Sequence, residues 1–412
     1  MSRPRDPERR ALLRAGLYGA GFGMTVPALL RNAAWAAPGV SSADTGRERI
    51  LVVVELTGGC DGLNTVAPVG DDAYAKARPK LAIDPDEALR LDDVFSLHPR
   101  LIGLHDLWKR DRLAIVHGCG YPDPDRSHFT SMRYWHTAAP HRAEPRGWIG
   151  RYADATWPGG RTAGLVNLAG QESPAIRSFE QAPIVFDDPA KYQRLGNAAS
   201  EDLYQKLSGA GASRRDMLGF VRHIAATARA TSQSVRAATA AYRTPVHYGA
   251  GFVPLARGLR NVAALLHADF PARVYYVATP GWDTHSAQTS RHDNLHLYLG
   301  DALEAFQKDL DRQGREASVM TLVFTEFGRR VAENASGGTD HGTATPMMWI
   351  GQHARPGLHG AAPSLTELDD PGDLIFTTDF RRVYASVLES WLGVPDAAAI
   401  LGDHYAPLEI TA

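Results

Sequence analysis

The chain has 412 residues, of which 44% are hydrophobic and 22% are charged, the composition of an ordinary soluble globular protein. Its formal net charge of -2 argues against nucleic acid as a partner and against a polybasic membrane-surface signal. The length fits one large α/β domain with insertions as well as two domains.

Residues 1–36 are predicted to be a twin-arginine export signal. Arg9-Arg10 precede an uncharged, mildly apolar stretch, and Ala34-Trp35-Ala36 matches an A-x-A cleavage site, so the mature chain would begin at Ala37. An ordinary secretory signal is the alternative. The apolar run is shorter than the roughly 20 residues that a membrane span needs, so no stable membrane anchor is expected. The predicted location is periplasmic or secreted, with the twin-arginine export machinery as a partner.

Two strands and a helix are predicted early in the mature chain. Residues 50–56 are almost continuously apolar, which is typical of a central parallel strand. Glu55 lies inside that strand, where a carboxylate is costly unless it is paired or bound to metal. A helix over 99–109 and a strand over 113–117 follow. Cys60 and Cys119 each come just after a strand, and one disulfide or two buried free thiols fit equally well.

A further helix is predicted to begin at Ser127 and to run to His136. A serine at a helix start is a common N-cap. The same position offers backbone N–H groups and the positive end of the helix dipole to an anion. Ser127 is therefore either a cap or part of an anion site.

The middle of the chain is predicted to hold a helical insertion or cap over residues 199–243, which are rich in Ala, Arg and Ser with helical spacing. A helix over 254–268, a strand over 273–278 and a helix over 289–312 follow. Asp283 and His285 lie at the end of that strand, and two ligand-type side chains two residues apart can meet one cation. The alternative is an N-cap aspartate beside a surface histidine.

The strand predicted over 319–325 ends at Glu326, and Asp340-His341 precede a second apolar run over 346–350. Ligand sites in open α/β sheets lie beyond the carboxyl ends of the strands. A doubly wound, mostly parallel sheet with helices on both faces would gather these side chains at one edge with Asp61. Carboxylates and imidazoles suit zinc or manganese, with magnesium or calcium where oxygens dominate. A polar loop whose histidine caps a turn is the alternative. The last predicted helix covers 380–392.

Six motifs together resemble a large bacterial family of twin-arginine-exported proteins that is catalogued as a domain of unknown function. That family is placed with the alkaline phosphatase and sulfatase superfamily. The motifs cover residues 50–64 (ILVVVELTGGCDGLN), 120–131 (GYPDPDRSHFTS), 281–285 (GWDTH), 324–330 (FTEFGRR), 338–342 (GTDHG) and 378–382 (TDFRR). The resemblance spans nearly the whole of residues 37–412 and implies one alkaline phosphatase-like α/β domain.

The resemblance also implies roles for individual residues. His341 would bind metal, and Asp283 with His285 would correspond to the superfamily's Asp and His metal pair. Ser127, or Thr130 as the second choice, would be the nucleophile. Glu55 or Asp61 would replace the first-strand aspartate.

Two departures bear on the activity. Glu326-Phe327 stand where the superfamily has Asp-His, so one metal ligand is replaced by a phenylalanine. No Cys/Ser-x-Pro-x-Arg sequence occurs, so a formylglycine sulfatase mechanism is unsupported.

The function predicted from the sequence is an exported metal-dependent hydrolase of small or polymeric phosphate or sulfate esters. Ser127 would attack, Arg126 or His128 would bind the anion, and a divalent metal would be held by Glu55, Asp61, Asp283, His285, Glu326 and His341. The alternative is a catalytically silent periplasmic binding or structural protein of the same fold. A cytoplasmic phosphomutase is disfavoured by the export signal.

Overall fold

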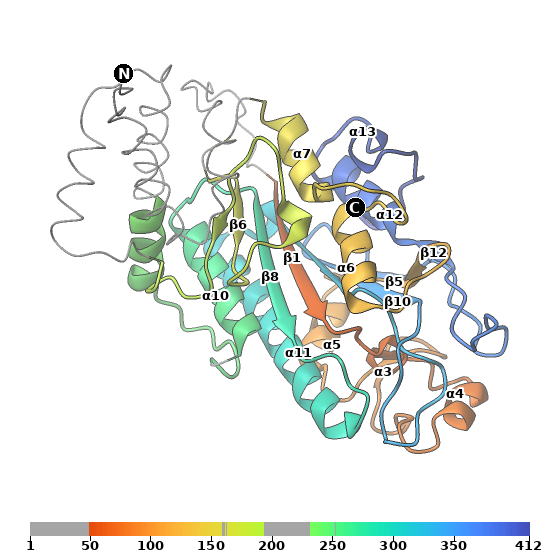
Figure 1. Ribbon diagram of the computed structural model, residues 1–412. Coiled ribbons are helices and arrows are strands. Elements are labelled where there is room, and N and C mark those ends of the chain that lie inside the picture. Colours follow the sequence, from red (N-terminus) through yellow and green to blue (C-terminus); the bar gives the residue numbers. More distant parts are fainter. Residues whose placement is uncertain (1–48, 159–160, 162, 193–230, 252) are drawn as a thin grey trace, which may run out of the picture.

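The computed structural model describes residues 49–158, 161, 163–192, 231–251 and 253–412 (Figure 1). The predicted export signal over 1–36 lies outside the described residues. Of the predicted insertion over 199–243, residues 231–243 are described and 231–241 form a helix, while 199–230 lie outside the described residues. No helix in the described ranges is long and apolar enough to span a bilayer.

The described chain is built on one nine-stranded sheet, with a small three-stranded sheet beside it. In spatial order the main sheet contains β11 (Gly357–His359), β5 (Leu113–Gly120), β10 (Thr345–Ile350), β9 (Val319–Phe324), β1 (Ile50–Thr57), β8 (Val274–Pro280), β6 (Leu165–Asn167) and β7 (Ile184–Val185), while β12 (Thr378–Asp379) pairs with β5. The small sheet contains β2 (Val66–Ala67), β4 (Ser96–Leu97) and β3 (Leu89–Arg90).

The main sheet is mostly parallel, which confirms the predicted fold class. Strand β10 differs, because it runs antiparallel to both of its neighbours, β5 and β9. Its first residue, Thr345, lies opposite Cys119 near the end of β5, and its last, Ile350, lies opposite Leu113 at the start of β5. The reversal places the residues that precede β10 at the same edge as the carboxyl ends of the parallel strands.

Helices cover both faces of the sheet (Figure 1). On one face lie α5 (Ile102–Lys109), α10 (Pro254–His267) and α11 (Gln288–Gln313), and on the other α6 (His128–Thr137), α7 (Trp148–Thr156), α12 (Phe380–Ser386) and its π-helical continuation η4 (Val387–Trp391). The short helices are α3 (Gly62–Thr65), α4 (Asp72–Ala77), η2 (Pro174–Ile176), η3 (Glu316–Ser318) and α13 (Ala398–Leu401).

The alternation of β1 explains how one apolar strand serves two cores. Val52 and Val54 pack with the α10 and α11 side, and Leu51 and Val53 pack with the α6 and α12 side. Successive side chains of a strand point to opposite faces, so a strand that is covered twice must be apolar throughout. Glu55 falls on the α6 side, where it needs a partner inside the core.

The two cysteines are separate buried thiols. Cys119 lies in β5, and Cys60 lies beside the hydroxyl of Thr65, with Sγ and Oγ1 3.3 Å apart. Burial raises the pKa of both thiols. Of the two alternatives left open by the sequence, the structure has the free thiols.

Candidate metal centre

Three side chains from three distant segments meet at the carboxyl edge of the sheet. His128 is the first residue of α6, Asp283 lies in the loop after β8, and His341 precedes β10. Among the described residues, these are the ones whose ligand atoms all lie within 4.8 Å of one another in a group suited to a metal ion. His341 reaches this edge because β10 is antiparallel.

A fourth side chain, His285, borders the same group. Its Nε2 lies 2.9 Å from Nε2 of His341 and 3.2 Å from Oδ1 of Asp283. Nε2 of His341 lies 3.4 Å from Oδ1 of Asp283, and Nε2 of His128 lies 3.5 Å from Oδ2. Three imidazoles therefore surround one carboxylate.

In each of the three imidazoles, the second ring nitrogen, Nδ1, lies within hydrogen-bond distance of an acceptor. Nδ1 of His341 donates to the backbone carbonyl of Arg126 at 2.8 Å, and Nδ1 of His128 lies 2.8 Å from Oε1 of Glu326. Nδ1 of His285 lies 3.1 Å from Oδ1 of Asp340. An acceptor at Nδ1 keeps the proton there and leaves a lone pair on Nε2. The three Nε2 atoms then face one another and Asp283.

Such an arrangement needs a positive charge at its centre. Two lone pairs 2.9 Å apart, on His285 and His341, cannot form a hydrogen bond unless one nitrogen gains a proton. Nε2 of His128 is buried and has no hydrogen-bond partner among the described residues. A proton on Nε2 of His285 or of His341, or a metal ion shared by the group, would supply the charge. Donors that are mostly imidazole nitrogen, with one carboxylate, fit Zn²⁺ or Mn²⁺ better than Mg²⁺ or Ca²⁺.

The charges around the group favour its ionised carboxylate. Partial burial opposes ionisation of Asp283, but the hydrogen bond and the charge of Arg329 outweigh it and lower the pKa of that carboxyl. Burial lowers the pKa of His341, which keeps the imidazole neutral. The hydrogen bond to Glu326 raises the pKa of His128. Of His128 and His341, His128 is therefore the one that holds a proton more readily.

Arg329 is a buried side chain that ties three loops of the site together. Its guanidinium donates to the carbonyl of Gly59 at 2.6 Å, to the carbonyl of Thr339 at 2.9 Å and to Oδ1 of Asp283 at 2.7 Å. Backbone crowding accompanies these bonds, since a Cβ on Gly58, whose φ is +126°, would lie 2.5 Å from the backbone nitrogen of Asp283. Arg329 stands within the FTEFGRR motif, but nothing in the sequence shows that it faces inward.

Gln288 is hydrogen-bonded to both the loop that carries Asp283 and His285 and the loop that carries His341. Its Oε1 accepts from the hydroxyl of Thr339 at 2.7 Å and from that of Thr284 at 3.1 Å, and its Nε2 donates to Asp61 at 2.6 Å. Thr284 lies between Asp283 and His285, and Thr339 lies two residues before His341. The buried amide therefore fixes the spacing of the two loops.

Phe327, the departure noted in the sequence, forms a wall of the site. Its ring centroid lies 4.9 Å from that of His128 and 4.7 Å from that of His341. The phenylalanine thus packs against two imidazoles at the position where the resemblance implies a metal-binding histidine. His128 and His285 bring further nitrogens to the group.

Three predicted metal ligands lie away from the centre of the group. Glu326, fully buried, sits behind His128 and accepts the backbone N–H of Gly58 at 2.8 Å. Asp61 is paired with Arg78 at 2.6 Å. Glu55 lies 2.8 Å from Nε2 of His136 and accepts the hydroxyl of Tyr276, inside the α6 side of the core. Each has a dedicated partner that local sequence does not reveal.

The predicted anion-binding residues have different surroundings from those expected. The guanidinium of Arg126 is paired with Asp373 and with Asp369, the latter at 3.1 Å, so its charge is already neutralised. His128 faces Asp283 as a candidate metal ligand. Ser127 is exposed at the N-cap of α6, and its side chain makes no capping hydrogen bond. Its hydroxyl is therefore not committed to the helix.

Comparison with known proteins gives one family and several distant structures. The model of the family described as "Protein of unknown function (DUF1501)" matches residues 48–371. No curated protein matches the sequence.

Three solved structures illustrate the distant likeness. The structure of Ps i-CgsB in complex with k-i-k-neocarrahexaose is 11% identical, with a TM-score of 0.37, over 87% of this chain and 73% of that one. A protein in the alkaline phosphatase superfamily from Vibrio parahaemolyticus is 12% identical, with a TM-score of 0.33, over 94% and 78%. Alkaline phosphatase from the Antarctic bacterium TAB5 is 7% identical, with a TM-score of 0.30, over 74% and 92%. Likeness at this level leaves the chemistry to the side chains of this chain.

Proposed function

The chain belongs to the DUF1501 family of proteins of unknown function, and we propose that its sheet-edge group is the centre of a metal-dependent hydrolase of phosphate or sulfate esters. The observation that carries the proposal is the convergence of the Nε2 atoms of His128, His285 and His341 on Asp283, with each Nδ1 already held by an acceptor. Lone pairs arranged in this way are the donor set of a cation site. A divalent cation held there would supply positive charge to the oxygens of the ester.

In this proposal Ser127 is the nucleophile. It directly precedes His128, it is exposed, and its hydroxyl does not cap α6. The N-terminus of this helix favours negative charge near the serine. The serine oxygen would bond to phosphorus or sulfur as the bond to the alcohol oxygen breaks. Ser127 gives up its proton, the alcohol takes one up, and water then releases phosphate or sulfate and restores the hydroxyl.

The two arginines near the site contribute differently. Arg329 holds Asp283 and four backbone carbonyls, so it keeps the carboxylate ionised and in place. Arg126 is paired with two aspartates, so among the protein groups the N-terminus of α6 is left to bind the ester's anionic oxygens. Its backbone carbonyl still orients His341.

We further propose that the protein acts after export to the periplasm. This part rests on the N-terminal sequence, in which Arg9-Arg10, the weak apolar stretch and Ala34-Trp35-Ala36 form the pattern of a twin-arginine signal. Localisation of the full chain and of an Arg9→Lys/Arg10→Lys variant by cell fractionation tests it. Retention of the variant in the cytoplasm supports the proposal, and unchanged export contradicts it.

The second candidate is a catalytically silent binding protein of the same fold. One observation favours it, namely that the guanidinium of Arg126, next to Ser127, is neutralised by Asp369 and Asp373. A phosphate or sulfate group would then lack the free arginine that often binds it bidentately.

Metal content and turnover together separate the two candidates. We expect wild-type protein to hold about one equivalent of a transition metal, because the donors surround one point. His341→Ala should lose it, and His404→Ala, which removes an exposed histidine outside the site, should keep it. Phosphomonoesters, phosphodiesters and sulfate esters are then screened with wild type and with Ser127→Ala.

The outcomes are distinct. Hydrolysis that disappears in both Ser127→Ala and His341→Ala supports the enzyme. Retained metal without turnover supports the binding protein. Absence of stoichiometric metal from the wild-type protein, or turnover unchanged by both substitutions, contradicts the proposed mechanism.

A further inference from the structure

Phe129 is the most exposed large hydrophobic side chain in the described part of the chain. It is 91% exposed, and the next one, Ile102, is 55% exposed. Single exposed apolar residues are common on protein surfaces, so exposure alone assigns no role. The position of Phe129 is informative, because it directly follows two residues of the candidate site, Ser127 and His128.

Phe129 breaks the pattern of the helix to which it belongs. Ser131 and Trp135 of α6, four residues apart, are buried on the face that is turned to the sheet. Arg133 is exposed on the outward face, as expected for a helix with one side in solvent. Phe129, four residues before Arg133, shares that outward face but is apolar. Departures of this kind are expected mainly at functional sites.

The geometry of the helix directs Phe129 toward the metal group. The Cα–Cβ bond of every residue in an α-helix points toward the N-terminus of that helix. The N-terminus of α6 is the end at which His128 meets Asp283 and His341, at the carboxyl edge of the sheet. Phe129 follows His128 by about 100° around the helix axis. Its side chain therefore starts beside the metal group and not within it.

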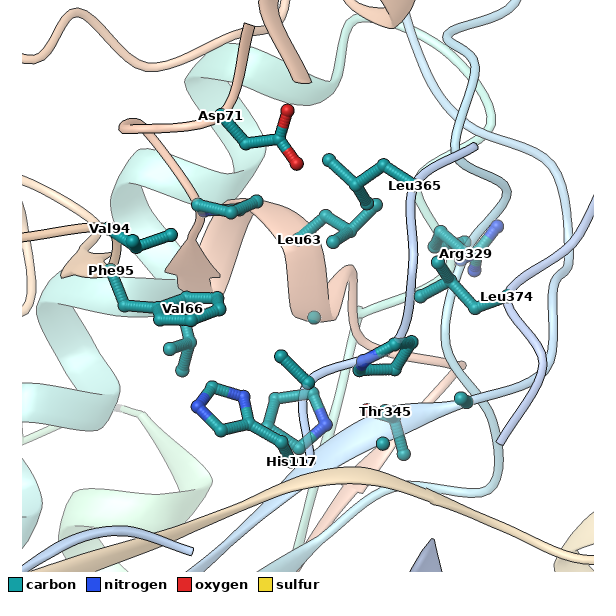
Figure 2. A pocket seen from close by; sticks show the side chains of 17 residues that line it. Leu63, Val66, Asp71, Val94, Phe95, His117, Arg329, Thr345, Leu365 and Leu374 are labelled. Carbon is teal, nitrogen blue, oxygen red and sulfur yellow. The ribbon is translucent and has the colours of Figure 1, made fainter. Parts of the chain in front are cut away.

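An ester at the metal group can extend into solvent but not into the protein. Figure 2 shows a pocket between the small sheet and the start of β10, which Arg329 borders. The buried guanidinium of Arg329 also donates to Asp283 at 2.7 Å, so this side chain stands between the pocket and the metal group. The side chains of Asp283 and His285 are exposed, which leaves the solvent side open. The alcohol portion of a bound ester therefore extends on the side where Phe129 is exposed.

We propose that Phe129 binds the alcohol portion of the substrate, and that the substrate is an ester of an alcohol with a large apolar group. This inference rests on the proposed function, because it takes Ser127 as the point of attack. Contact between the apolar group and the exposed ring removes the surface of both from water, which stabilises the complex. An aromatic group gains further from stacking on the ring.

Esters of benzyl alcohol and of ethanol test the inference, because the two alcohols are of similar acidity and differ mainly in apolar surface. The full-length protein is assayed with both phosphates and with both sulfates. We expect the wild type to have the higher kcat/KM for the benzyl ester. Phe129→Ser should lower the benzyl-to-ethyl ratio of kcat/KM about three- to tenfold.

A second exposed phenylalanine provides the matched control. Phe179 packs its ring on Arg146 and belongs to a different part of the surface. Phe179→Ser makes the same substitution there and should keep the wild-type ratio. Phe129→Trp, which keeps an aromatic surface at the site, should retain the preference for the benzyl ester.

The inference and the proposed function fail in different ways. If the wild type hydrolyses both esters and Phe129→Ser keeps the ratio, or both serine variants lower it equally, the inference is wrong and the hydrolase stands. If the wild type hydrolyses none of the esters, the proposed function fails, and calorimetric titration with benzylphosphonate and ethylphosphonate decides on Phe129. Tighter wild-type binding of benzylphosphonate that is lost in Phe129→Ser supports Phe129 as a binding residue of a silent protein. Equal binding of the two phosphonates, or no saturable binding, overturns the inference.

Discussion

Asp61 and Asp283 both follow the carboxyl end of a parallel strand, yet their surroundings differ completely. Asp61 is fully buried, pairs with Arg78 at 2.6 Å and accepts the amide of Gln288 at 2.6 Å. The side chain of Asp283 is 46% exposed and faces three imidazoles besides Arg329. The positive charge of Arg78 neutralises Asp61, whereas Asp283 faces the Nε2 atoms of three histidines in addition to Arg329.

The difference teaches how to separate structural from functional carboxylates at a strand end. A buried charge is tolerated when one dedicated partner and further hydrogen bonds satisfy it. Asp61 meets this condition at Oδ2, which accepts from both Arg78 and Gln288, while its buried Oδ1 has no hydrogen-bond partner among the described residues. Asp283 is paired with Arg329, but it also lies among three histidine Nε2 atoms that carry lone pairs and cannot donate a hydrogen bond. Removing a partner should therefore harm stability in the first region and cation binding in the second.

The largest expected effect is a loss of protein stability when the ion pair of Asp61 and Arg78 is broken. Arg78→Met would leave Asp61 buried without its cation, and loss of one partner of a buried pair costs about 3–5 kcal/mol. We expect denaturant unfolding to show this loss in the free energy of unfolding. Arg90→Met removes an arginine that pairs with Asp93 on the surface and should cause no measurable change. Equal effects of the two substitutions would show that the Asp61 pair is not a special stabilising feature.

The next largest effect is on the metal affinity of the group around Asp283, and it tests the role of Glu326. Glu326→Gln should weaken metal binding about 10–100-fold, as is usual for outer partners of ligating histidines, because the carboxylate no longer holds Nδ1 of His128. Competition with a chelator measures the affinity. Glu333→Gln, a change at a half-exposed carboxylate that binds backbone N–H groups of Lys80 and Leu81, is the control. Unchanged affinity in Glu326→Gln would remove Glu326 from the metal centre.

The smallest effect is the acid dependence of stability. Burial opposes ionisation of Asp61, but Arg78 outweighs it and lowers the carboxyl pKa below its ordinary value near 4. A depressed folded-state pKa stabilises the protein above the unfolded-state pKa, and this contribution is lost as the pH falls through the folded value. Below about pH 4 the free energy of unfolding should thus fall by up to about 1.4 kcal/mol per pH unit for this one group.

The contribution of Asp61 can be isolated by a double variant. Asp61→Asn/Arg78→Met removes both charges, and its unfolding free energy, measured without metal, should lose less than that of wild type between about pH 4 and pH 2. Parallel pH curves for the two proteins would show that the pair does not titrate in this range.

The sequence predicts most of the fold because its central strands are continuous apolar runs. Strands β1, β5, β8, β9 and β10 and helices α6, α10 and α11 begin within a residue or two of their predicted starts. The direction of β10 relative to its neighbours cannot be predicted, because an apolar run fits a parallel and an antiparallel strand equally well. Its reversal is nonetheless what brings His341 to the carboxyl edge.

The sequence predicts only those site residues that lie next to a recognisable strand. Asp283, His285 and His341 follow or precede strands, so strand ends alone place them at one edge. His128 carries no such mark, and its role as a candidate ligand depends on the direction in which Glu326 turns its ring. The closing partners of Glu55 and Asp61, His136 and Arg78, lie 81 and 17 residues away in the chain. Local pattern cannot reveal pairs that only the tertiary fold creates.

Strand β10 also determines the order in which the molecule can be completed. Among the described strands, it alone joins β5, β11 and β12 to β9, β1 and the strands beyond. A nascent chain that ends before residue 345 lacks β10, β11 and β12. Strand β5, which leads into α6 and His128, is then not yet joined to the strands that carry Asp283. Because contacts between such distant segments form late, we expect the candidate metal centre to be complete only when the whole sheet has assembled, so that metal occupancy would report complete assembly.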